Sequence, residues 1–334
     1  MLEVVHPGPL LTIQDRGRPG FAHLGVPPSG ACDPWGFAVA GILAGAGPGA
    51  AALEVTLAGA ELLAVETCAV ALAGADLGAE RDDGLPLASD AVHRLPAGAR
   101  LRFGGVARRP WSGDTSGMRG YLSLAGGVAA ARVLGSASTL VAGALGGIDG
   151  RALRAGDRLV PVRPGDLAAV GRAWPAGLIP HPASRPGPIG FVPGPDVRHL
   201  PAGAVPSLAT AAWTVDAASD RMGVRLAGTP LAPGTEILSH ALVPGAIQVP
   251  AGGLPIVMLA DGPTLGGYPV IGVVPRSELP RLGQLRPGDR VTFLPMTADE
   301  ARAAWREATR LLVHVAATVG ADAVWRRLED DAGG

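Results

Sequence analysis

The sequence predicts a mainly β protein built from two β-barrels, with a few helices and a helix at the C-terminus. Short runs of Val, Leu, Ile and Ala, such as residues 62–73 and 254–260, are separated by turns rich in Gly and Pro. Many short apolar runs punctuated by turn residues are typical of barrels and sandwiches. Helical periodicity is missing from most of the chain, and 334 residues suffice for two domains with separate cores.

Two segments nevertheless carry the signals of helices. Asp33 and Pro34 provide an N-cap and a proline at the first helical position, and the apolar run WGFAVAGILAGAG follows them. Near the C-terminus, Thr297 and Glu300 fit a capping box, and apolar residues then recur at helical spacing. We therefore expect one helix after Asp33 and another within residues 297–334.

The two halves of the chain echo each other. The segment LRAGDRLVPV closes the first half and LRPGDRVTFL closes the second, and each half opens with Gly-Pro followed by an apolar run. Residues between the halves are rich in Pro and Gly and show no periodicity, which is typical of a linker. We expect a first β-barrel domain at 1–171, a linker at 172–190, a second β-barrel domain at 191–296 and a helical tail at 297–334.

Composition argues against several classes of partner. The formal net charge is −1, and the chain has neither a basic face nor an aromatic ladder, so we expect no binding to nucleic acid. No apolar segment approaches the length of a membrane span, and the first residues lack the basic start of a secretory signal. The two cysteines, Cys32 and Cys68, form no disulfide framework. These features predict a soluble cytoplasmic protein that does not bind membranes.

The chain contains no lysine, so every one of its 28 Lys and Arg residues is arginine. It therefore offers no Schiff-base lysine, no P-loop lysine and no amine to which biotin could be attached. Any carrier or cofactor that needs a lysine amine must come from another chain. The seven histidines show no HxxxH or HxH pairing, so we also expect no metal site.

Four polar clusters interrupt the apolar background, at residues 10–34, 219–226, 245–255 and 259–269. Arginine suits carboxylate or phosphate through its planar guanidinium, and glycine lets backbone N–H groups approach a ligand closely. Together the clusters predict a cleft that binds an anionic ligand. Its candidate ligand-binding residues are Gln14, Asp15, Arg18, Arg221, Arg225, Gln248, Asp261, Thr264 and Tyr268.

Each cluster also has a purely structural interpretation. Asp15 and Arg18 could form an ion pair across a turn, which contributes little if it is exposed. Arg221 and Arg225 could be surface residues on one face of a strand. The stretch that begins at Asp261 fits a turn stabilised by its own side-chain hydrogen bonds. Residue spacing assigns no catalytic residue and leaves the reaction open.

Five motifs, taken in order, resemble the biotin-dependent carboxyltransferase family. They are GPLLTIQDRGRPGFAHLGVPPSGACDP, ALEVTLAGAEL, SDRMGVRLAG, GAIQVPAGGLPIVMLADGPTLGGYPVIG and LPRLGQLRPGDRVTF. The family includes allophanate hydrolase subunit 2, the Kip inhibitor antagonist and the C-type subunit of 5-oxoprolinase. The resemblance covers about residues 4–296 and implies two cyclophilin-like β-barrels. Asp220 stands where relatives commonly have Asn, and Leu265 where they often have a small hydroxyl residue.

The resemblance implies a function as a subunit of an enzyme. The leading expectation is the C-type subunit of an ATP-dependent 5-oxoprolinase, a hydrolase that opens the lactam of 5-oxoproline to glutamate. This enzyme combines its C-type subunit with a sibling B-type subunit and a third, lactam-utilisation subunit, and ATP is bound by or shared with a partner. One alternative is a carboxyltransferase of the allophanate hydrolase subunit 2 type, acting on urea-like amides with biotin supplied by another chain. Another is a non-enzymatic antagonist of a histidine-kinase inhibitor. No covalent biotin is expected on this chain.

Overall fold

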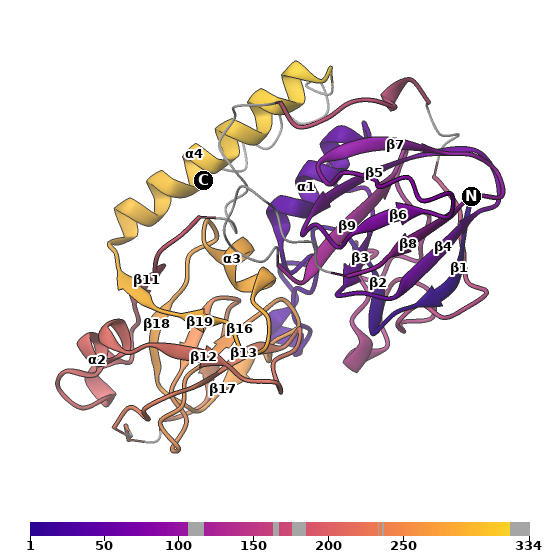
Figure 1. The fold of residues 1–334 in the computed structure, drawn as a ribbon. Helices are drawn as coiled ribbons and strands as arrows, with labels where there is room; N and C mark the ends of the chain where they lie inside the picture. Colours follow the sequence, from indigo (N-terminus) through magenta and orange to yellow (C-terminus); the bar gives the residue numbers. More distant parts are fainter. Residues whose placement is uncertain (106–116, 163–166, 176–184, 233, 236, 321–334) are drawn as a thin grey trace.

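The structure, a computed structural model, describes residues 1–105, 117–162, 167–175, 185–232, 234–235 and 237–320. Within these ranges the chain is mainly β, as the turn-punctuated apolar runs predict, and strands from the two halves form separate sheets (Figure 1). The α-helices are α1 (Pro34–Leu43), α2 (Ala204–Thr210), α3 (Leu279–Gln284) and α4 (Ala298–Thr318). Short 3-10 helices are η1 (Ala22–Leu24), η2 (Val141–Gly143), η3 (Leu167–Ala169) and η5 (Val197–His199).

The first half forms two five-stranded antiparallel sheets that pack face to face. One sheet has the order β10 (Arg158–Leu159), β1 (Leu2–Pro7), β4 (Ala60–Ala64), β8 (Arg100–Phe103), β6 (Ala79–Arg81). The other has the order β2 (Leu10–Gln14), β3 (Ala52–Thr56), β9 (Arg119–Leu124), β5 (Cys68–Gly74), β7 (Ala91–Leu95). Leu2 and Leu62 from the one sheet and Leu53 and Val70 from the other share a single core.

Strand β5 is buried along its whole length. Its alternate residues Val70 and Leu72 face the core between the sheets, while Ala69 and Ala71 face helix α1 on the other side. Both faces of the strand are therefore buried, and the small alanines let the helix pack closely. The apolar run at 62–73 is in fact two strands, β4 and β5, joined by a short turn.

The second half forms one eight-stranded sheet that nearly closes into a barrel. Its edge strands, β19 and β20, are separated in the chain by Thr292 alone, so the sheet curls until its two edges meet. Trp213, Phe191 and Phe293 are almost fully buried in its interior. The strand order is β19 (Arg290–Val291), β12 (Trp213–Val215), β13 (Gly223–Ala227), β16 (Ile256–Met258), β15 (Ala246–Gln248), β18 (Val270–Val273), β11 (Ile189–Pro193), β20 (Phe293–Pro295). A separate hairpin pairs β14 (His240–Ala241) with β17 (Leu265–Gly266).

The two echoing motifs form turns with the same hydrogen bonds. The side chain of Asp157 accepts a hydrogen bond from the backbone N–H of Arg154 at 2.7 Å, and that of Asp289 accepts one from Arg286 at 2.8 Å. Each turn leads directly into a two-residue strand, β10 or β19. The sequence echo therefore corresponds to a repeated local structure.

The predicted helix caps are confirmed. The carboxylate of Asp33 accepts hydrogen bonds from the first-turn N–H groups of α1, and Thr297 and Glu300 form a complete capping box at α4. Helix α4 leaves the second sheet and runs back towards α1 (Figure 1), where Leu312 and Val315 join the core beneath that helix. The C-terminal helix thus links the two halves by packing.

Part of the predicted linker lies in the described residues. Trp174 packs against Trp35 of α1 with ring centroids 6.1 Å apart, and β11 begins at Ile189. Residues 176–184 of the predicted linker and 321–334 of the predicted tail lie outside the described ranges. The predicted domain boundaries stay a prediction.

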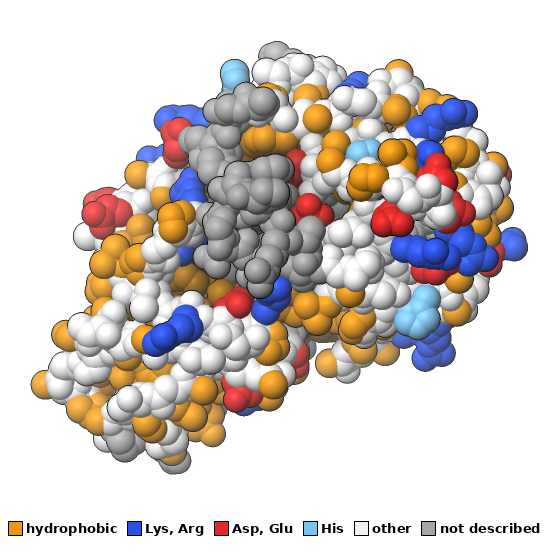
Figure 2. Space-filling view, viewed as in Figure 1, with side chains coloured by type: hydrophobic (Ala, Val, Ile, Leu, Met, Phe, Trp, Pro, Cys, Tyr) orange, Lys and Arg blue, Asp and Glu red, His pale blue; other side chains and the backbone are white. Residues whose placement is uncertain are grey.

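The distribution of charged side chains and the length of the helices can be compared with the expected partners. On the face seen in Figure 2, arginine and carboxylate side chains are interspersed among apolar ones. None of the helices in the described ranges is long and apolar enough to cross a membrane.

Candidate functional site

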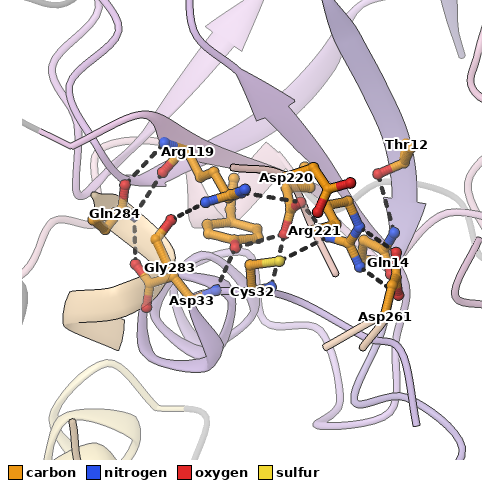
Figure 3. A network of polar contacts seen from close by, with 12 residues as sticks. Thr12, Gln14, Cys32, Asp33, Arg119, Asp220, Arg221, Asp261, Gly283 and Gln284 are labelled. Atoms are coloured by element: carbon orange, nitrogen blue, oxygen red, sulfur yellow. Dashed lines mark hydrogen bonds and ion pairs between the residues drawn. The ribbon is translucent and has the colours of Figure 1, made fainter. Parts of the chain in front are cut away.

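A buried carboxylate, Glu54, occupies the middle of β3 and faces α1 rather than the core between the sheets. Its Cα partner on β9 is Tyr121, whose hydroxyl donates a hydrogen bond to Glu54 Oε2 at 2.7 Å. The backbone N–H of Cys32 donates to the same oxygen at 2.9 Å, and Arg221 Nη1 donates to Oε1. Arg119 Nε lies 3.7 Å from Glu54 Oε1. Cys32, Arg119 and Arg221, which surround this carboxylate, are labelled in Figure 3.

Arg221 comes from the segment just before β13, and its guanidinium crosses to the first half of the chain. Its Nε donates to Asp261 Oδ2 at 2.8 Å, and its Nη2 donates to the carbonyl of Gly30 at 2.7 Å. On the far side of Asp261, the hydroxyl of Ser29 donates to Oδ1 at 2.7 Å. The contact between the two β units is therefore a buried polar network at this point, drawn in part in Figure 3.

Burial and charge shift the pKa values of these groups in defined directions. Burial alone would raise the pKa of Glu54, but Arg221 and Arg119 lower it below its usual value. Burial alone would lower the pKa of Arg221, but Cys32, Glu54 and Asp261 raise it well above its usual value. Both groups are therefore charged across the ordinary pH range.

The two other titratable groups beside Glu54 stay neutral. Burial, with the charge of Glu54, raises the pKa of Tyr121 well above its usual value. Burial raises the pKa of the Cys32 thiol to about 11. Tyr121 thus remains a hydrogen-bond donor, and Cys32 is not set up as a nucleophile, which would need a lowered pKa.

The end of α3 inserts into the same region. Gln284 Nε2 donates to Asp33 Oδ2 at 2.6 Å and to the carbonyl of Arg119 at 2.8 Å, while its Oε1 accepts from the backbone N–H of Arg119 at 2.8 Å. The guanidinium of Arg119 in turn donates to the carbonyl of Gly283. Both polar atoms of the Gln284 amide are used to join the second unit to β9 and to the N-terminus of α1.

Asp15 holds the end of β2 against the loop that contains Ser136 and Ser138. Its carboxylate accepts hydrogen bonds from both serine hydroxyls at 2.6 Å, and from the backbone N–H groups of Ala137 at 2.7 Å and Gly17 at 2.8 Å. These four bonds satisfy the carboxylate within the fold. Asp15 therefore positions its neighbours and presents no free oxygen to a ligand.

Three side chains near Asp15 each have one polar atom without a hydrogen-bond partner among the described residues. They are Gln14, Arg18 and Thr139. Gln14 Nε2 donates to Thr12 Oγ1 at 3.0 Å and to the carbonyl of Thr139 at 3.1 Å, and Arg18 Nη2 donates to the carbonyl of Ser138. Within the described part of the chain, Gln14 Oε1, Arg18 Nη1 and Thr139 Oγ1 are buried and have no hydrogen-bond partner. We call these three side chains the triad.

Two of the nine predicted site residues, Arg221 and Asp261, form the junction of the two β units. Three others, Gln14, Asp15 and Arg18, bond to residues of the first unit, including Ser136, Ser138 and Thr139.

The other four predicted site residues belong to the second unit. Arg225 and Gln248 both stand opposite Ile256 in the register, and Gln248 Nε2 donates to the carbonyl of Tyr268 at 3.2 Å. Thr264 is buried just before β17, and its carbonyl accepts from Leu242 N–H at 2.9 Å. These four residues share no hydrogen bond with the junction network among the described contacts.

Several residues of the junction were not predicted as site residues. Glu54 is the one charged residue in the buried strand ALEVT, and a charge in such a strand was the available signal. Gln284 was the only glutamine of three outside the four clusters. Asp220 does not pair with Arg221 in the described contacts; its carboxylate accepts from the backbone N–H of Met222 at 2.8 Å. In the described ranges, no group of three or more His, Cys, Asp or Glu side chains could hold a metal ion.

Known proteins share this architecture. Residues 24–295 match the family described as carboxyltransferase domain, subdomain A and B. The chain is 34% identical over 323 residues to the C-type subunit of 5-oxoprolinase from Escherichia coli (strain K12), covering 95% of this chain and 98% of that protein. It is 32% identical over 324 residues to the urea amidolyase of Lachancea kluyveri, covering 90% of this chain but 17% of that protein. The crystal structure of K. lactis urea amidolyase superposes with a TM-score of 0.82 at 30% identity, over 94% of this chain and 20% of that one.

The match over residues 24–295 shows that the two β units form a carboxyltransferase-type domain. The chain belongs to the biotin-dependent carboxyltransferase family, which the resemblance of its five motifs predicted. Its relatives include a 5-oxoprolinase subunit matched at full length and urea amidolyases that are several times longer.

Proposed function

We propose that this chain is the C-type subunit of an ATP-dependent 5-oxoprolinase. The observation that carries the proposal is the similarity to the E. coli 5-oxoprolinase subunit from one end to the other, over 95% of this chain and 98% of the relative. The corresponding 5-oxoprolinase subunit of Haemophilus influenzae is matched over 93% of its length. Urea amidolyases contain the same unit as a small part of a much longer chain.

A lactam resists hydrolysis because its amide is stabilised by resonance. ATP, when bound, supplies activation by phosphorylating the amide oxygen, which makes the amide carbon electrophilic. The part of this chain is to bind and orient the lactam through the fixed donors and acceptors at the junction. Because the chain has no lysine, and Arg119 and Arg221 are bonded to carboxylate or carbonyl oxygens, we place ATP on a partner subunit or on a site shared with it.

A second candidate function is carboxyl transfer to urea or a similar amide. The TM-score of 0.82 with urea amidolyase favours it. In that case biotin would arrive on another chain, because this one has no lysine to carry it. Both candidates share a substrate with an amide group, and they differ in whether ATP and water or carboxybiotin act on it.

Co-expression with the neighbouring B-type and lactam-utilisation subunits tests the first candidate. We expect the chain to co-elute with its B-type partner and the assembly to release glutamate from 5-oxoproline only when ATP is present. The same assembly with urea, ATP and bicarbonate, with and without a biotinylated carrier, tests the second candidate. ATP-dependent glutamate release by the chain alone, or consumption of urea but not of 5-oxoproline, would overturn the proposed function.

A further inference from the structure

The second β unit contains a hollow of about 320 Å³ that is partly open to solvent. It lies beside the end of helix α3, where the two edges of the eight-stranded sheet meet, and the surrounding elements α3, β11, β12 and β19 are labelled in Figure 1. Its lining includes Ile189, Ala212, Arg281, Leu285, Arg290 and Val291. Ligand pockets in proteins typically enclose about 300–1,000 Å³, so the hollow has room for a small organic molecule.

Much of this lining is apolar. Ile189 on β11 and Val291 on β19 are almost fully buried and belong to the core of the second unit. Leu285, directly after α3, is half-buried and packs against the same core. An apolar cavity of about 150 Å³ can hold a benzene molecule, so the hollow can take a ring together with a polar group.

Arg290 brings a positive charge to the hollow. This arginine is exposed, and it forms no hydrogen bond or ion pair with the residues that the structure describes. The adjacent Asp289 carboxylate accepts from the backbone N–H of Arg286 at 2.8 Å and lies 4.0 Å from Arg286 Nε. Glu278 is paired with Arg281 at 2.8 Å. Both nearby carboxylates are therefore matched by other arginines, and the charge of Arg290 is left for a ligand.

The second arginine of the lining, Arg281, is used within the fold. Its Nη1 donates to the carbonyl of Pro188 at 2.6 Å and to Glu278 Oε2 at 2.8 Å, and its Nη2 donates to the carbonyl of Gly187. These bonds hold the residues just before β11 against α3. The wall of the hollow is therefore formed before any ligand binds, which lowers the cost of ordering it.

We propose that this hollow binds a small organic anion. Its carboxylate or phosphate group pairs with Arg290, and its apolar body lies against Ile189, Leu285 and Val291. A planar guanidinium suits either kind of anion. The hydroxyl of Thr292, which also lines the hollow, can donate a further hydrogen bond.

This site is separate from the junction of the two β units. Its lining residues share no described hydrogen bond with Glu54 or Arg221. The inference does not depend on the proposed function, because it rests on the hollow and on the charge of Arg290. One source of such an anion is 5-oxoproline, which carries a carboxylate, and the other is an acid that takes no part in the reaction.

Probes of matched shape test the site on the full chain, with binding measured by ligand-detected NMR. Benzoate and benzamide share a ring and differ in charge, and we expect benzoate to bind about fivefold more tightly, as is typical of a partly exposed ion pair. Phenyl phosphate distinguishes a phosphate ligand from a carboxylate. Inorganic phosphate tests the need for an apolar body, and 5-oxoproline tests the proposed substrate as the source of the anion.

Two variants separate the charge from the space. Arg290→Gln should bind benzoate no better than benzamide and keep its melting temperature, since no described ion pair is lost. Arg225→Gln is the matched control, because this exposed arginine lies on β13 of the same sheet, and it should bind benzoate as the wild type does. Ala212→Leu adds carbon atoms to the lining and should weaken the binding of both benzoate and benzamide.

The outcomes are decisive for the site and independent of the proposed function, which glutamate release by the assembly tests. Unchanged benzoate binding after Arg290→Gln, or equal binding of benzoate and benzamide, would overturn the role of Arg290. Inorganic phosphate that binds as tightly as phenyl phosphate would overturn the apolar part. No binding of benzoate or phenyl phosphate by the wild type would overturn the site. Binding of 5-oxoproline that depends on Arg290 would support the site and identify the proposed substrate as its ligand.

Discussion

Arg221 and Glu54 form a buried ion pair across the junction of the two β units, although 167 positions separate them in the sequence. The pair is not isolated, because Asp261, Gly30 and the Cys32 sulfur accept from the other guanidinium donors. The Tyr121 hydroxyl and the Cys32 backbone N–H bond to the carboxylate. A buried pair is stable only when its remaining lone pairs and protons are also bonded. The junction meets that condition and should therefore be rigid.

Arg221→Gln should destabilise the protein strongly. The change leaves the carboxylates of Glu54 and Asp261 buried without their cation. Removal of one partner of a buried ion pair typically lowers the free energy of unfolding by about 3–5 kcal/mol. Arg225→Gln is the matched control, since this arginine lies four positions further on and is exposed. It should change stability by less than about 0.5 kcal/mol. Urea unfolding measures the free energy of unfolding of both variants. An equal decrease in both would contradict the role assigned to Arg221.

Acid should weaken the junction through Glu54. Its pKa is lowered in the folded protein, so its contribution is complete above the unfolded value of about 4.3 and is lost as pH falls through the folded value. Glu54→Gln should therefore be less stable near neutrality but lose less stability between about pH 5 and pH 3. Glu61→Gln is the control, because Glu61 also has a lowered pKa but lies at the surface, bonded to Arg100. Parallel pH profiles for wild type and Glu54→Gln would contradict the prediction.

Both thiols should be unreactive in the folded protein. Burial raises the pKa of Cys32 to about 11 and also raises that of Cys68, so little thiolate is present near neutral pH. A chromogenic disulfide reagent added at about pH 8 should release almost no colour until guanidinium unfolds the chain, when both thiols react. Rapid labelling of Cys32 in the folded state would show that the junction opens readily.

Helix α4 should stabilise the first half of the chain by packing. Val315 is fully buried in the cluster that contains α1, so Val315→Ala should lower the unfolding free energy by about 2 kcal/mol. Val313→Ala, on the same helix but only half-buried, is the control and should lose less than half as much. Equal losses would mean that α4 does not dock on α1 as described.

Local features were predictable because their causes are local. The cap at Asp33 and the capping box of Thr297 and Glu300 depend on residues within three positions of each other, and both form as expected. The mainly β class follows from short apolar runs and turns in the same way. The apolar run at 62–73 contains parts of two strands, β4 and β5, because only three residues separate them.

The site was only partly predictable, because spacing does not show which distant groups meet. Arg221 and Arg225 look alike in the sequence, yet the first enters the junction and the second is exposed on β13. Glu54 was hidden in an apolar strand, and Thr139 in a polar stretch with no motif of its own. The anion-binding cleft predicted from the arginines stays untested.

The sequence by itself determined the mainly β class, the helix caps and the family. It also excluded chemistry that needs a lysine amine on this chain. Each of these depends on composition or on neighbours along the chain. Only the tertiary structure decided that Arg221 neutralises Glu54, that Asp15 is satisfied within the fold, and that the triad keeps three free atoms. Folding brings these groups together from strands far apart in the chain, and hydrogen bonding depends on distance in space.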